Sequence, residues 1–256
     1  MMDGGLLFSP PAGKSPCPFE ARRPSVKMHR TVIKSLPLFE TMSDADLDRL
    51  LAQATPRRVL QGEAVFKQGE TATSFFLLLS GRLKVTQVTG DGQQIIVRVV
   101  HPGELFGFAK ALARPDYPGT ATAVTDSITL AWPGDLWSDF IGRTPLVAAR
   151  TMQTLGRQLD EAHTRIREMS TQESERRVAH AILRLSGKAG RKEEAGIQIG
   201  FPISRRDIAE MTGTTLHTVS RILSAWNARG LVEVGRQKII VRDLAGLTRL
   251  AEGKAD

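Results

Sequence analysis

The residues whose type and spacing could do chemistry lie in one polar series near the C-terminus. There, arginine and hydroxyl side chains alternate with Val219, Ile222 and Leu223, which would bury the opposite face of a helix. An arginine guanidinium can donate to both O6 and N7 of guanine, whereas hydroxyls serve bases or phosphates. We expect Arg221 to read a base edge, with a phosphate contact as the alternative. The other residues expected to contact a nucleic acid from this face are Thr215, His217, Thr218 and Ser220.

Two short helices joined by a tight turn are needed to hold this series in place. Ser204 precedes the first helix as an N-cap residue, and Asp207 follows at the spacing of a capping box. Ala209 is small where two helices must pack closely, and Gly213 falls in the turn, where a positive φ is easiest without a Cβ atom. The spacing predicts a helix-turn-helix within Ile203–Arg242, with two ordinary packed helices as the alternative.

Two short β-rich runs follow the second helix and predict a hairpin, the wing of a winged helix-turn-helix. They are Gly230–Val234 and Lys238–Val241, separated by Gly235-Arg236-Gln237. Polar and cationic residues around a reading helix position a protein on double-stranded DNA through its phosphates. The residues expected in that role are Ser204, Arg205, Arg206, Arg236 and Lys238.

An apolar seam precedes this unit and predicts a helix that pairs with a second copy of the chain. Its members recur at spacings of 4, 3, 4, 3, 4 and 3 residues, the a/d pattern of a coiled coil. A seam this narrow is more typical of an intermolecular pair than of packing within one domain, which is the alternative. The expected dimerisation residues are Ala148, Met152, Leu155, Leu159, Ala162, Ile166 and Met169.

Short β-rich runs separated by glycines fill the stretch from Val59 to Trp132. Such runs are typical of a closed or rolled antiparallel sheet, and Thr89-Gly90-Asp91-Gly92 is the clearest hairpin turn. The predicted strands are Ala64–Lys67, Phe75–Leu79, Leu83–Thr89, Gln94–Val100, Thr120–Val124 and Ile128–Trp132.

The fold class that follows is α+β, with four parts in chain order. Prolines and glycines predict a disordered tail at 1–27, which contains Cys17. A rolled β domain at 28–144 and the dimerisation helix at 145–170 come next. The winged helix-turn-helix domain occupies 171–256, and its polar stretch 187–196 is expected to be a loop.

Composition narrows the classes of protein that this chain can represent. A net charge of +8 favours a polyanionic partner. The single cysteine excludes a disulfide within one chain and any site built from four cysteines. No apolar run approaches the roughly 20 residues of a membrane span, so we expect a cytoplasmic protein without membrane contact. We find no P-loop, no metal-ligand spacing and no nucleophile motif, so we expect neither an enzyme nor a metal site.

From Met28 onward the chain resembles the CRP/FNR family of bacterial transcription regulators. The segments that carry the resemblance are Phe75–Gly81, Pro102–Gly107, the apolar seam and Thr218–Leu223. The resemblance implies a cyclic-nucleotide-binding-like β-roll, a long dimerisation helix and a C-terminal winged helix-turn-helix. It also implies a homodimer that binds a palindromic site, responds to an effector in the β-roll and acts with RNA polymerase.

Departures from the family pattern bear on the effector. Members that bind cyclic AMP have a carboxylate after the glycine that matches Gly107, where Phe108 stands here, and an arginine in the run that matches Gly119-Thr120-Ala121. A buried cyclic phosphate without its arginine would be unpaired, so we do not expect cyclic AMP to bind. An iron–sulfur cluster is excluded by the single cysteine. The resemblance leaves a haem- or nitric-oxide-linked member, similar to the DNR and NnrR regulators of denitrification, or a member that needs no ligand.

Four residues are candidates for an effector pocket. Phe106, Phe108 and Leu112 could line a haem or simply fill the core, and the resemblance places His163 where the dimerisation helix faces the pocket. His163 or His101 could ligate a haem iron, and a solvent-facing or hydrogen-bonded histidine is the alternative for each.

The reading helix also departs from its relatives. FNR-like members have a glutamate where His217 stands, whereas Ser220 and Arg221 are kept, so we expect a TTG-like half-site with a changed neighbouring base preference. A competing hypothesis is a β-roll module that binds a ligand and controls a partner protein without binding DNA.

Overall fold

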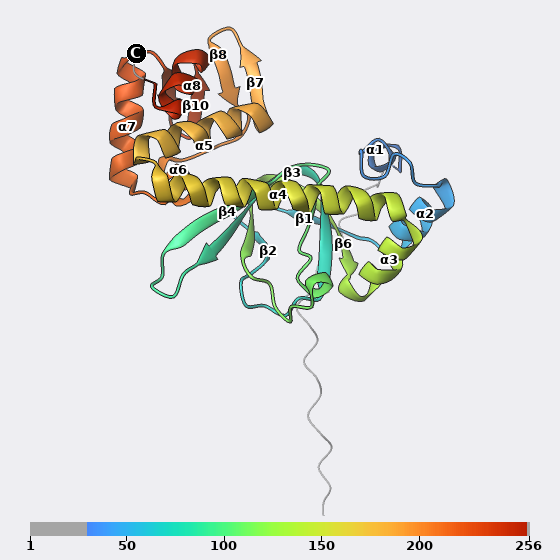
Figure 1. The fold of residues 1–256 in the computed structure, drawn as a ribbon. Coiled ribbons are helices and arrows are strands. Elements are labelled where there is room, and N and C mark those ends of the chain that lie inside the picture. The colour runs from blue at the N-terminus through green and yellow to red at the C-terminus, as the bar shows by residue number, and fades with distance from the viewer. Residues whose placement is uncertain (1–29, 255–256) are drawn as a thin grey trace, which may run out of the picture.

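The structure is a computed structural model that describes residues 30–254 (Figure 1). The predicted disordered tail at 1–27 lies outside the described residues. A β-rich domain is followed by the long helix α4, Pro145–Thr171, and then by a helical domain with a sheet of its own. Helix α4 runs along the β-rich domain and carries the C-terminal domain at its last turns. The predicted α+β architecture is confirmed.

An antiparallel sheet forms the N-terminal domain. Its strands follow the order β1-β6-β3-β4, while β2 pairs with β6 and β5 pairs with β3. The strands are β1 Thr55–Val59, β2 Ala64–Phe66, β3 Ser74–Val88, β4 Gln94–Val100, β5 Leu105–Phe106 and β6 Thr120–Pro133. The helices of this domain are α1 Arg30–Lys34, α2 Asp44–Ala52 and α3 Trp137–Arg143, with 3₁₀ turns η2 at Lys110–Leu112 and η3 at Gly134–Leu136.

The two central strands, β3 and β6, each join two runs that the sequence predicts as separate strands. Gly81 lies inside β3 at φ +87°, and a Cβ atom there would come within 2.2 Å of the Ser127 hydroxyl on β6. The register of β3 against β6 shifts around this glycine. Gly81 therefore bends a continuous strand instead of ending it. The hairpin predicted at 89–92 is confirmed, since Val88 pairs with Gln94.

Aromatic side chains fill the inside of the roll. The rings of Phe66 and Tyr117 stack with centroids 3.9 Å apart, and those of Phe76 and Phe106 stack at 5.2 Å. All four side chains are buried, and the Tyr117 hydroxyl donates to the carbonyl of Ser74 at 2.8 Å. Stacked rings with a satisfied hydroxyl form a packed interior.

A second aromatic cluster ties the sheet to the helices. Phe75 stacks on Trp132 at 5.5 Å and meets Trp137 edge-on at 5.0 Å. The Trp132 indole donates to the carbonyl of Leu50 in α2 at 2.9 Å, and Val147 of α4 is buried in the same cluster. The start of α4 is thus fixed to the β-roll.

The C-terminal domain surrounds a core of its own. Its elements are α5 Ser174–Ala189, β7 Gly190–Glu193, β8 Gly196–Ile199, α6 Arg205–Thr212, α7 Leu216–Ala228, β9 Val232–Gly235, β10 Lys238–Val241 and α8 Leu244–Glu252. The strands form a sheet in the order β7-β8-β10-β9. Val178, Leu223 and Leu247, from α5, α7 and α8, are buried together.

The prediction of a loop at 187–196 is wrong. Helix α5 continues to Ala189, and β7 and β8 form a hairpin whose strand β8 pairs with β10 of the wing. Strand β8 buries Ile199, but every residue of β7 is exposed. The sequence of this polar hairpin has no alternation of apolar and polar residues that would predict strands. The hairpin instead depends on the pairing of β8 with β10, which is distant in sequence.

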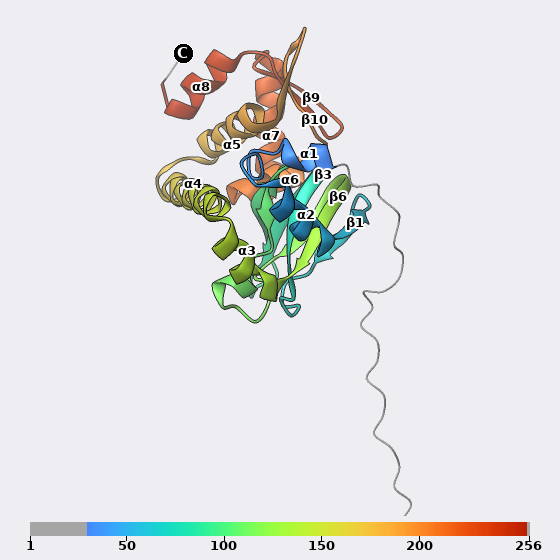
Figure 2. The same cartoon turned by 90° about the vertical axis from the view of Figure 1, so that its right-hand side faces the viewer.

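Contacts also join the C-terminal domain to the β-roll. Lys84 Nζ lies 2.6 Å from Asp207 Oδ1, and Gln94 Nε2 donates to Glu210 Oε2 at 3.1 Å. The Arg82 guanidinium lies 4.6 Å from the centroid of the Phe201 ring. Figure 2 shows α6 beside the sheet in this arrangement.

Candidate nucleic-acid interface

Helix α6 begins with a complete capping box. The Ser204 hydroxyl accepts from the backbone N–H of Asp207 at 3.1 Å, and the Asp207 carboxylate accepts from the backbone N–H of Ser204 at 2.9 Å. The same hydroxyl donates to the Asp207 carboxylate at 2.6 Å. Two N–H groups that the helix leaves free are therefore satisfied, and the Ser204 hydroxyl both accepts and donates within the cap.

Asp207 is also the residue through which α6 contacts the β-roll. Burial by itself raises the pKa of Asp207, but hydrogen bonds from Lys84 and Ser204 outweigh it and hold the pKa below its ordinary value. The carboxylate is therefore ionised at neutral pH, opposite the Lys84 ammonium.

The turn between the two helices has the predicted form. Gly213 ends α6 in the left-handed region at φ +60°. Helix α7 follows Thr215, whose hydroxyl accepts from the backbone N–H of Thr218 at 3.1 Å. On its inner face Val219 and Trp226 are fully buried. The cap and the buried residues hold α7 as a rigid element with its other face outward.

The outward face of α7 carries most of the predicted reading residues. His217 and Arg221 are exposed, and Thr218 and Ser220 are half-buried at the sides of the helix. Ser224 is exposed one turn beyond Arg221 and was not among the predicted reading residues. The spacing of three residues from Arg221 was the available signal.

Further cations flank this face. Arg205 and Arg206 are exposed in the first turn of α6, and Arg236 and Lys238 are exposed on the wing. The backbone N–H of Ile203 donates to the carbonyl of Gln237 at 3.1 Å, which fixes the wing turn to the start of the two-helix unit. Among residues 30–254, Arg205, Arg206 and Arg236 have no ion-pair partner within 4 Å, so they are available to phosphates.

The seam residues of α4 form an apolar row on the surface of the single chain. The side chains of Met152, Leu159 and Ile166 are 66%, 56% and 60% exposed, and Met169 is exposed as well. Ala148, Leu155 and Ala162 are half-buried. The row from Met152 to Met169 is therefore not covered by the chain's own β-roll.

The structure does not bring the four effector-pocket candidates together. Phe106 is packed in the aromatic interior of the roll, whereas Phe108 lies against Trp137 with centroids 4.9 Å apart. Leu112 is 61% exposed and His163 is exposed on α4, so neither lines a buried pocket in this chain. Of the two alternatives for Phe106, filled core is the one observed.

A cavity of about 360 Å³ lies where Phe108 meets α4. Leu38, Leu105 and Leu155 supply its apolar wall, and Arg150 and Thr151 supply polar groups. His101 and His163 are not among its lining residues.

His101 sits in a polar setting instead. Its Nδ1 atom is hydrogen-bonded to the Arg82 guanidinium, and its backbone N–H donates to Glu104 at 3.3 Å. Burial lowers the pKa of His101, and the charge of Arg82 lowers it further, so the imidazole is neutral at neutral pH. His101 is therefore hydrogen-bonded within this chain.

Within residues 30–254, no three His, Cys, Asp or Glu side chains are grouped so as to hold a metal ion. In the same range, no helix combines the length and the apolar character that crossing a bilayer requires.

Two family models match the chain. A model of the cyclic nucleotide-binding domain matches residues 56–144, and a model of the Crp-like helix-turn-helix domain matches residues 176–250. These matches fall on the β-roll and on the C-terminal domain.

Curated relatives are similar over most of their length. The cyclic AMP receptor protein of Thermus thermophilus is 32% identical over 87% of this chain and 100% of its own. The transcriptional activator protein FnrA of Stutzerimonas stutzeri is 28% identical over 86% of this chain and 90% of its own.

Solved structures share the fold. A transcriptional regulator of the CRP family from Thermus thermophilus has a TM-score of 0.66 at 26% identity, over 77% of this chain and 96% of that one. The c-di-GMP responsive regulator CLP of Xanthomonas campestris has a TM-score of 0.70 at 16% identity, over 78% of this chain and 100% of that one, which is a likeness of fold alone.

Proposed function

The chain belongs to the CRP/FNR family of DNA-binding transcription regulators, and we propose that it acts as a homodimer on a palindromic promoter element that α7 reads in the major groove. The observation that carries this proposal is Arg221, exposed in the middle of a helix whose other face is fully buried. A rigid helix that presents one guanidinium and several hydroxyls matches the donor pattern that base edges require.

The exposed seam of α4 supports the homodimer. Two copies paired along this row would remove Met152, Leu159 and Ile166 from water and set the two α7 helices about a two-fold axis. A two-fold protein reads a palindrome, so half-sites about one helical turn apart are expected. RNA polymerase is part of this proposal, because a regulator on a promoter acts through the enzyme that transcribes from it.

The half-site is proposed to contain a TTG-like element. Arg221 would pair with its guanine, and Ser220, at the side of the helix, would contact the neighbouring base or backbone. His217 is exposed one turn before Arg221, so it would meet the adjacent base pair with an imidazole instead of a carboxylate. A changed preference at that base pair follows from the different donor and acceptor pattern.

Control is proposed to act through the β-roll, but not by cyclic AMP. The relative from Thermus thermophilus is named for cyclic AMP. In this chain the interior of the roll is occupied by Phe66, Phe76, Phe106 and Tyr117, and Thr120 has no adjacent arginine for a phosphate. A cyclic nucleotide placed there would displace stacked rings and leave its charge unpaired.

The cavity beside Phe108 gives no support to a haem-linked response to nitric oxide. The cavity beside Phe108 has no histidine, cysteine, methionine or tyrosine in its lining, so a haem in it would lack an axial ligand from this chain. Absorption spectra of the purified protein, with and without added haem and nitric oxide, test this directly. A Soret shift that alters DNA affinity would overturn our reading of this cavity.

A selection from DNA with randomised half-sites tests the proposed function. We expect two enriched half-sites, inverted with respect to each other, and binding that weakens steeply with salt because cations displace the counterions of phosphates. Failure to enrich any sequence, together with salt-independent binding, would instead favour the β-roll module that controls a protein partner.

A further inference from the structure

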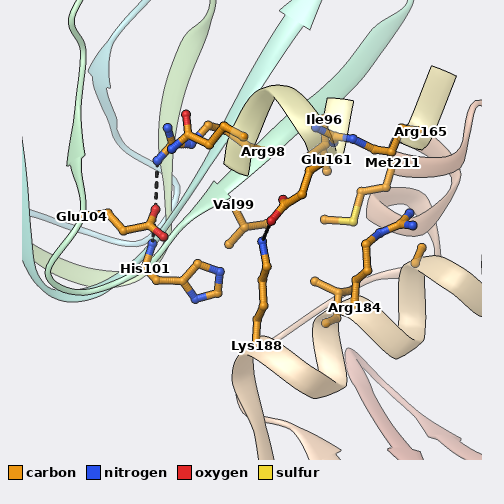
Figure 3. Close-up of a pocket in the computed structure, with 13 residues that line it drawn as sticks. Ile96, Arg98, Val99, His101, Glu104, Glu161, Arg165, Arg184, Lys188 and Met211 are labelled. Atoms are coloured by element: carbon orange, nitrogen blue, oxygen red, sulfur yellow. Dashed lines mark hydrogen bonds and ion pairs between the residues drawn. The ribbon is translucent and has the colours of Figure 1, made fainter. Parts of the chain in front are cut away.

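A cavity at the junction of the three parts of the molecule has no role in the function proposed above. Its volume is about 90 Å³, and β4, α4, α5 and the end of α6 all line it (Figure 3). The β-roll contributes Arg98, the long helix contributes Arg165, and α5 contributes Arg184 and Lys188. The cavity therefore lies where the sensor and DNA-binding domains meet.

The lining carries more positive than negative charge. Arg98 is paired with Glu104 at 2.9 Å, and Lys188 is paired with Glu161 at 2.5 Å. Figure 3 shows Lys188 and Glu161 meeting from α5 and α4, whereas Arg98 and Glu104 both belong to the β-roll. Arg184 bonds at 2.5 Å to Glu168, which is not in the lining. The lining itself thus holds four cations and two carboxylates.

Arg165 is the cation whose partner is missing. Among residues 30–254 it makes no hydrogen bond and no ion pair, although it is half-buried on α4. Burial and the nearby Arg184 charge lower the pKa of Arg165, and they outweigh the charges of Glu161 and Glu168, which raise it. A half-buried guanidinium beside a second guanidinium is a setting that favours an anion between them.

Neutral His101 adds no charge to this set. Its ring bonds Arg82, and its pKa lies below the ordinary value because it is buried. The lining therefore has two positive charges in excess, and because Glu168 offsets that of Arg184, the charge left without a carboxylate partner is that of Arg165.

We propose that this cavity binds a small ligand through a phosphate group, which Arg165, Arg184 and Arg98 hold between the β-roll and the DNA-binding domain. Arginine forks bond phosphate oxygens in pairs, so one tetrahedral group can satisfy guanidinium groups from three elements at once. The small volume fits a single phosphate group rather than a whole nucleotide.

A ligand in this cavity would stabilise the present arrangement of the β-roll and the DNA-binding domain. Lys84–Asp207 and Gln94–Glu210 already join α6 to the roll nearby. A phosphate that binds only when β4, α4 and α5 are together stabilises that arrangement in proportion to its occupancy. This inference goes beyond the proposed function, and its test needs no DNA.

Calorimetric titration of the full chain with inorganic phosphate, at constant ionic strength set by chloride, is the test. We expect Arg165→Gln to weaken phosphate binding by about tenfold or more, since it removes a charge-assisted pair. Arg167→Gln is the matched control, because Arg167 is exposed on the same helix and outside the cavity. The control should bind phosphate like the wild type.

Arg221→Ala separates the cavity from the DNA-facing surface. Phosphate binding that survives Arg221→Ala and falls with Arg165→Gln supports the cavity. Binding that falls with Arg221→Ala and survives Arg165→Gln overturns the proposal, as does a wild type that binds no phosphate. Far-UV circular dichroism of Arg165→Gln shows that the variant is folded.

A second arm identifies the source of the phosphate group. Glycerol phosphate is titrated beside inorganic phosphate under the same conditions. Tighter binding of the ester assigns the cavity to a phosphorylated metabolite, and equal or weaker binding assigns it to phosphate itself.

Discussion

At the scale of single residues, Arg221 and Lys238 are two cations with different expected roles. Arg221 projects from the reading helix, whereas Lys238 lies on the wing and is only 4.0 Å from Glu193. We predict that Arg221→Ala weakens binding to the preferred DNA site by about 1–3 kcal/mol and removes the preference for the guanine that Arg221 contacts. Lys238→Ala should weaken binding to all DNA sequences alike. It should also reduce the slope of log affinity against log salt concentration by about one. Fluorescence anisotropy on matched and mismatched duplexes measures both, and equal losses on every duplex for Arg221→Ala would assign it to the backbone.

Asp207 gives a prediction about pH. Its pKa is lowered in the folded state, so its stabilisation is complete above the unfolded value of about 3.9 and is lost as the pH falls through the folded value. We predict that Asp207→Asn destabilises the protein by about 1–2 kcal/mol at neutral pH and that this difference shrinks in acid. Urea unfolding across the acid range is the measurement. A difference that stays constant with pH would show that the charge of Asp207 does not contribute.

Residues whose role depends on nearby sequence could be predicted. The Ser204–Asp207 cap and the left-handed Gly213 belong to local patterns, and the structure has both. The setting of Arg165 could not be predicted, because its neighbours come from β4 and α5. The sequence pattern of a charged residue on a helix surface does not distinguish a side chain that faces solvent from one that faces another domain.

At the scale of elements, the row along α4 is the feature with the most direct consequence. A carboxylate in a paired seam would be buried without a partner, so we predict that Leu159→Glu converts a dimer to a monomer at micromolar concentration. Arg167→Glu introduces the same group off the seam and should remain dimeric. Sedimentation velocity distinguishes these outcomes. A dimeric Leu159→Glu would show that the pair forms elsewhere.

Elements with strong internal periodicity were predictable, and elements defined by pairing were not. Helix α4 ends one residue from the predicted boundary, since its seam extends over three heptads. The hairpin of β7 and β8 was missed because exposed charged residues form it only against β10. Strand β3 was divided at Gly81 because a glycine signals a break in sequence, whereas here it permits a close approach to Ser127.

At the scale of the whole molecule, the ion pair between Lys84 and Asp207 links two domains. Both side chains are largely shielded, with 26% and 19% exposed, so the pair is worth more than a surface pair. We predict that Lys84→Met raises amide hydrogen exchange in α6 and β4 together, as contact between them loosens.

Arg58→Met provides the control, because the Arg58–Asp126 pair is highly exposed and lies within the β-roll. It should leave exchange in α6 unchanged. Equal exchange in Lys84→Met and Arg58→Met would mean that the interdomain contact is held by other groups.

The division of the chain into a rolled sheet, a long helix and a winged unit followed from sequence, but the placement of these parts relative to one another did not. The contacts that set it join side chains far apart in the sequence, such as Gln94 with Glu210 and Val99 and Val124 with the C-terminal core. Isolated contacts across domains leave no periodic signal. The cavity at the junction depends on the same placement, and it was invisible for the same reason.

The tryptophans are divided between the N-terminal and C-terminal domains, so their intrinsic fluorescence can report on each domain separately. Trp132 and Trp137 lie in the cluster that fastens the helices to the sheet, whereas Trp226 lies fully buried in the C-terminal core, with its indole donating to Glu175 at 2.8 Å. These are the three tryptophans of the chain. With Trp132 and Trp137 replaced by phenylalanine, the remaining emission comes from the DNA-binding domain alone. Its fluorescence then reports whether that domain unfolds together with the β-roll or separately from it.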